Sequence, residues 1–104
     1  MKTTMKLSSL LLGCVVAAIP LTAAFAYTGQ EFASEAKLTL DQARAVALKA
    51  FPGTITDEEL EKEGGGSGLR YSFDVKSGAT THEVGVDAKT GKVLENSLEG
   101  KHSD

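Results

Sequence analysis

The stretch LRYSFDVKSGATTHEVGVDAKTGKVL, residues 69–94, contains the clearest strand and turn signals of the sequence. Its first part alternates between two sets of side chains, the apolar Leu69, Tyr71, Phe73 and Val75 and the polar Arg70, Ser72, Asp74 and Lys76. This period of two predicts a strand that buries one face and exposes the other. A change on the polar side, such as Arg70→Ala, is therefore expected to cost under about 1 kcal/mol of folding free energy.

The second part of the stretch predicts that the chain turns back into an antiparallel sheet. Ser77-Gly78 forms a turn signal, and the next strand alternates through His82, Val84, Val86 and Ala88. Residues 87–91, Asp-Ala-Lys-Thr-Gly, are typical of a hairpin in which a type I turn precedes a left-handed glycine. A short fourth strand is expected over residues 92–96.

Upstream, the sequence predicts one helix. Thr39 and Gln42 have the spacing of a capping box, in which each side chain satisfies a free backbone amide of the first turn. Apolar residues then recur every three or four positions, at Leu40, Ala43, Val46, Ala47, Ala50 and Phe51. Pro52-Gly53 ends this helix.

A further strand is expected between the helix and the glycine-rich turn at residues 64–68. Ile55 and Leu60 differ by an odd number of positions, so a β-bulge near Asp57 is needed to place both on one face. The fold class that follows is α+β, with one N-terminal helix packed on a three- to four-stranded antiparallel sheet. One face of this sheet is covered by the helix and the other faces water.

The first 26 residues have the order of a cleavable signal peptide. Lys2 and Lys6 precede an apolar run over residues 7–21, and Ala24-Phe25-Ala26 matches a signal peptidase site. Two alternatives stay open: a retained membrane helix, and a lipoprotein signal in which Cys14 is acylated. The expected organisation is a signal peptide at 1–26, a flexible arm at 27–37, the folded domain at 38–96 and a polar tail at 97–104.

Charge and cysteine content restrict the function classes. Residues 27–104 carry 9 basic and 14 acidic side chains, a net charge of −5, which disfavours nucleic acid as a partner. The single cysteine, Cys14, lies in the signal region, so no disulfide is expected within the exported domain. We expect a periplasmic or secreted protein without a stable membrane anchor after cleavage.

Five carboxylates form an acidic run beside the glycine turn, at Asp57, Glu58, Glu59, Glu61 and Glu63. Three interpretations stay open: a cation site, a contact surface for a basic protein partner, and a solvated strand face. The run lacks the spacing of an EF-hand loop. His82 and His102 lack metal-ligand spacing, and no nucleophile and base can be paired. The sequence therefore predicts no catalytic residue, no metal ligand and no cofactor.

Four segments together resemble a PepSY domain, the module found in propeptides of secreted peptidases. They are residues 38–43 (LTLDQA), 50–53 (AFPG), 71–75 (YSFDV) and 83–94 (EVGVDAKTGKVL). The resemblance implies a helix on an antiparallel sheet, an extracytoplasmic location and no enzymatic activity. In thermolysin-like proteases such domains belong to the propeptide, which assists folding of the attached enzyme and inhibits it.

The functional hypothesis is a non-enzymatic exported module that binds a protein and inhibits or regulates a secreted or envelope protease. Its contact surface is expected on the sheet face or edge that the helix leaves free, near residues 55–63. The alternative hypothesis is an envelope protein that binds a small ligand or cation through residues 57–63.

Overall fold

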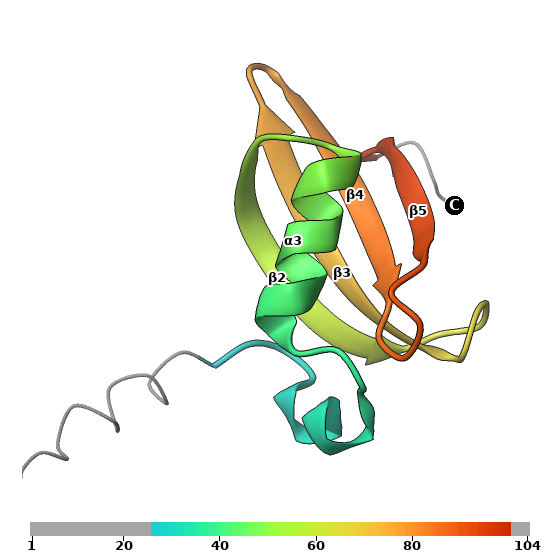
Figure 1. The fold of residues 1–104 in the computed structure, drawn as a ribbon. Helices are drawn as coiled ribbons and strands as arrows, with labels where there is room; N and C mark the ends of the chain where they lie inside the picture. Colours follow the sequence, from blue (N-terminus) through green and yellow to red (C-terminus); the bar gives the residue numbers. More distant parts are fainter. Residues whose placement is uncertain (1–25, 101–104) are drawn as a thin grey trace, which may run out of the picture.

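The computed structural model describes residues 26–100 and shows the predicted α+β layout (Figure 1). A four-stranded antiparallel sheet has the order β2-β3-β4-β5, so each strand pairs with its neighbours in the sequence. The strands are β2 (Thr54–Lys62), β3 (Leu69–Ser77), β4 (Thr80–Asp87) and β5 (Val93–Leu98). Helix α3 (Leu40–Ala50) lies across one face of this sheet. Strands β2 and β5 form its two edges.

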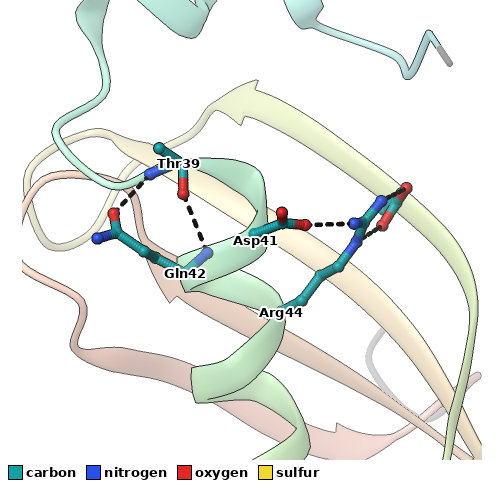
Figure 2. Close-up of polar contacts among 5 residues, drawn as sticks. Thr39, Asp41, Gln42 and Arg44 are labelled. Carbon is teal, nitrogen blue, oxygen red and sulfur yellow. Dashed lines mark hydrogen bonds and ion pairs between the residues drawn. The ribbon is translucent and has the colours of Figure 1, made fainter. Parts of the chain in front are cut away.

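Helix α3 begins at the predicted capping box (Figure 2). The Gln42 backbone N–H donates to the Thr39 hydroxyl oxygen at 3.1 Å, and the Thr39 backbone N–H donates to the Gln42 side-chain carbonyl at 2.9 Å. Ala43 and Ala47 are fully buried against the sheet. Because alanine side chains are short, the helix approaches the sheet closely at these two positions.

The core lies between α3 and the sheet. Tyr71, Phe73 and Val75 of β3 are buried, and so are their cross-strand neighbours Val84 and Val86 of β4. Leu60, Leu69 and Ala88 complete this apolar layer on the strand side. The predicted alternation along β3 therefore sets which face of the sheet packs against the helix.

The bulge predicted near Asp57 is confirmed. The register of β2 with β3 shifts between Ile55 and Asp57, so Thr56 has no partner opposite it. The extra residue lets Ile55 and Leu60 both pack against the core, although their spacing is odd.

The segment expected as a flexible arm at 27–37 instead packs against the sheet, so that prediction is wrong. It contains a 3₁₀ helix, η2 (Gln30–Glu35), and Phe32 and Ala36 contact the core. Thr28 forms a parallel bridge with Glu59, and the Leu60 N–H donates to the Thr28 carbonyl at 2.8 Å. Tertiary contacts, which a search for periodicity does not detect, hold this segment in place.

The boundary predicted at residue 96 is also corrected. Strand β5 runs through Leu98, and the Glu99 N–H donates to the Thr81 carbonyl at 2.9 Å. Pairing with β4 thus continues into the part expected as a polar tail. The signal-peptide prediction for 1–26 lies, apart from Ala26, outside the described residues, as does the tail beyond residue 100.

Candidate functional site

The acidic run divides between the two faces of the sheet. Glu58 lies on the side of α3, where its carboxylate accepts two hydrogen bonds from the Arg44 guanidinium, at 2.9 and 2.7 Å. Arg44 also pairs with Asp41 at 2.6 Å within the helix (Figure 2). A bidentate pair of this kind fixes the helix to β2. Glu58, predicted as a partner contact, is therefore engaged within the fold.

Three other members of the run point to the opposite face. Asp57, Glu59 and Glu61 lie directly across from Asp74, Ser72 and Arg70 of β3. These β3 residues alternate with the buried Tyr71, Phe73 and Val75 and so face away from α3. Glu63 follows the end of β2 and is exposed. Glu63 interacts with Glu61, so the structure brings together four of the five predicted contact residues and separates Glu58 from them.

We call this second side of the sheet the open face, because no helix among residues 26–100 covers it (Figure 1). Its side chains come from all four strands: Asp57, Glu59, Glu61, Arg70, Ser72, Asp74, Lys76, Glu83, Glu95 and Ser97. Acidic residues outnumber basic ones six to two in this set. Sequence reasoning missed Asp74, Glu83 and Glu95 as members of one surface, although their polar parity was visible in each strand.

The centre of the open face places carboxylates directly opposite one another. Asp74 lies across from Asp57 on one side and from Glu83 on the other. Like charges at directly opposed positions destabilise a sheet. The pKa of Asp74 is raised to about 6, mainly by burial. Repulsion from Glu99, Asp57 and Glu83 raises it further, and so does a side-chain hydrogen bond with Glu99.

Glu61 is a second perturbed carboxylate on this face. Burial raises its pKa, and repulsion from Glu63 and Glu59 acts in the same direction. A hydrogen bond donated by the Ser72 hydroxyl at 2.7 Å partly opposes this effect by stabilising the anion. Two acidic groups of the open face therefore hold protons more tightly than they would in water.

Arg70 does not behave as its polar parity suggested, because only 8% of its surface is exposed. Its guanidinium donates to the Gly64 carbonyl at 3.0 Å and approaches Glu95 at 3.5 Å. It lies over Gly85, where a Cβ atom would stand 3.1 Å from its Nη1. The small cost expected for Arg70→Ala assumed an open side chain, whereas the glycine turn and Glu95 cover it.

Asp87 links the hairpin to the glycine turn and is only 1% exposed. Its carboxylate accepts hydrogen bonds from the Ser67 N–H and hydroxyl, both at 2.7 Å, and from the N–H groups of Lys89 and Thr90. Burial would raise its pKa, but these donors outweigh burial and lower the pKa to about 2. The role of Asp87 is structural, since its lone pairs are used within the fold.

His82 also has a structural environment. Its ring stacks on Phe51 with centroids 3.8 Å apart, and its Nδ1 lies 2.7 Å from the Asn96 side-chain oxygen. It sits on β4, which is an inner strand of the sheet. Within residues 26–100, no three His, Cys, Asp or Glu side chains are grouped so that they could hold a metal ion.

The part of the chain that the structure describes contains no helix long and apolar enough to cross a membrane.

The sequence of this chain is similar to those of known proteins. Residues 37–96 match the family model PepSY, described as "Peptidase propeptide and YPEB domain". A curated relative, the uncharacterized protein YkoJ of Bacillus subtilis (strain 168), is 27% identical over 70 residues. The match covers 67% of this chain and 41% of YkoJ, so the chain spans less than half the length of that relative. No solved structure matches.

Domains of this family are generally non-catalytic propeptide or regulatory modules and are typically found in extracytoplasmic proteins. The family model covers more than half of the chain, from just before the capping box to the middle of β5. The chain belongs to the PepSY family.

Proposed function

We propose that this protein is a non-enzymatic, extracytoplasmic binding module whose open face docks onto a cationic surface of an exported protein. The observation that carries the proposal is the row of opposed carboxylates at Asp57, Asp74 and Glu83. Such a row costs folding free energy in the isolated domain. A partner that brings lysine or arginine side chains to this row would remove the cost on binding.

The proposed partner is a secreted or envelope protease, which the module would inhibit or regulate. Membership of a family described by peptidase propeptides supports this choice. The module is expected to inhibit or regulate the protease by covering part of its surface, without a chemical reaction of its own. Attraction between opposite charges would speed the encounter, so the association rate should fall as salt concentration rises.

The competing cation-binding function is not favoured, because Glu58 is engaged with Arg44 and the remaining carboxylates do not converge as metal ligands within residues 26–100. A divalent cation needs several oxygen atoms about 2.0–2.6 Å from one point. Opposed strand positions instead spread their carboxylates over a flat surface, which suits several separate cationic side chains.

Capture from the exported protein fraction tests the proposal with two matched variants. Asp74→Asn with Glu83→Gln removes two charges from the open face. Glu31→Gln with Glu35→Gln removes the same number from η2, whose Phe32 packs against the core, and also removes the surface ion pair of Glu35 with Lys62. We expect the wild type and the η2 variant to retain the same exported protein, and the open-face variant to lose it. If that protein is a protease, the wild-type module should inhibit it. Equal retention by both variants would refute the open face as the docking surface.

A further inference from the structure

A groove opens beside the outer edge of β2 and shares Asp57 with the open face. It has a volume of about 740 Å³, within the usual size range of ligand sites. Three parts of the chain line it: residues 26–28, Arg44 of α3, and residues 55–58 of β2. The groove therefore lies between the N-terminal segment and the half of β2 that this segment does not pair with.

The outer edge of β2 already makes one backbone bridge, to the chain's own N-terminal part. The Leu60 N–H donates to the Thr28 carbonyl, and this bridge is parallel. Outward and inward amides alternate along an antiparallel strand. The Glu58 N–H therefore has the same outward direction as that of Leu60, and it points to the groove.

Charge around the groove favours a basic occupant. Arg44 is the one cation among the lining residues, and its guanidinium is already paired with Glu58 and Asp41. Asp57 adds a further carboxylate, so the groove and its rim have a negative balance. Ile55 supplies a partly buried apolar surface at the same place.

We infer that this groove accepts an extended polypeptide segment that carries a lysine or arginine and adds a strand to the edge of β2 along residues 54–58. Backbone hydrogen bonds would supply affinity, and the carboxylate of Asp57 would select the basic side chain. The inference rests on the proposed function, because it specifies how a segment of the protein partner would be held. It adds a second contact at the strand edge, next to the open face.

The test uses a capped six-residue peptide of alternating lysine and valine, titrated into the ¹⁵N-labelled protein. We expect the largest amide shifts at residues 54–58 and at least about tenfold slower hydrogen exchange of the Glu58 amide at saturation. N-methylation of the peptide backbone keeps the charge but removes the pairing, so it should weaken binding by about tenfold or more. A glutamate-valine peptide should not bind.

Matched protein variants separate the edge from general charge effects. Thr56→Lys places a cation on the edge strand inside the groove, whereas Thr80→Lys makes the same change at an exposed position of β4. Only the first should abolish peptide binding. Shifts centred on Ser72, Glu83 and Glu95 and insensitive to N-methylation would overturn the edge site while leaving the open-face proposal standing. Absence of any binding would overturn the edge site as well, and the capture experiment would still decide the proposed function independently.

Discussion

Asp74→Asn should stabilise the protein at neutral pH, because Asp74 is ionised there at a position that disfavours its charge. A pKa of about 6 against an ordinary value of 3.8 corresponds to about 3 kcal/mol at about 1.4 kcal/mol per pKa unit. Asp74 is only half-buried, so solvent screening reduces the expected gain to about 1–2 kcal/mol. In a domain of this size such a gain raises Tm by at least about 4 °C.

The pH dependence follows from linkage. The folded protein holds the Asp74 proton more tightly than the unfolded chain does, so stability falls as pH rises from about 4 to about 6. The advantage of the Asn variant should therefore be full at pH 7 and nearly absent at pH 3.5. Urea unfolding of both proteins at the two pH values measures it, with Glu31→Gln as a control for net charge. Destabilisation by Asp74→Asn, or an equal effect at both pH values, would refute the conclusion that burial and neighbouring carboxylates disfavour the charge of Asp74.

Three further changes test other parts of the structure. Asp87→Ala should lower the free energy of unfolding by about 2–3 kcal/mol at pH 7. This loss should shrink as pH falls from about 4 towards 2, because the wild-type carboxylate becomes protonated. An equal loss at pH 2 in urea unfolding would contradict this. Gly29→Ala should release the N-terminal segment, because the φ of Gly29 is 87° and a Cβ atom there would overlap the Leu60 carbonyl. Hydrogen exchange of the Leu60 amide should then become at least about tenfold faster. An unchanged exchange rate would argue against the contact between Thr28 and Leu60. Arg70→Ala should cost about 1.5–3 kcal/mol in urea unfolding, since a buried side chain and its hydrogen bonds are lost; a cost below about 0.5 kcal/mol would indicate that Arg70 is solvated.

The sequence predicted the elements with strong local signals. Alternation identified β3 and β4, the Thr39 and Gln42 pair located the start of α3, and the odd spacing of Ile55 and Leu60 required the bulge. These signals depend on residues close in sequence, whose spacing directly reflects backbone periodicity. The N-terminal segment carries no such pattern, because Phe32 and Ala36 are held by residues distant in the sequence.

The candidate site was only partly predictable for a related reason. The acidic run was predicted as one surface, but alternation along β2 places Glu58 on the side of Leu60, where it meets Arg44 of another element. The opposition of Asp74 to two carboxylates depends on strand register, which the turns between strands determine. The burial of Arg70 depends on a loop folding over it, and long cationic side chains often lie along a surface in this way.

Carboxylates of the open face are proposed to contact cations of a protein partner, and the titration of Asp74 reports on that contact. Carbon-13 detection of its carboxyl group should give a pKa of about 6 in the free protein. In the complex with the protein that the wild type captures, nearby cations should lower this pKa, because they stabilise the carboxylate. An unchanged or higher pKa for Asp74 in that complex would contradict the claim.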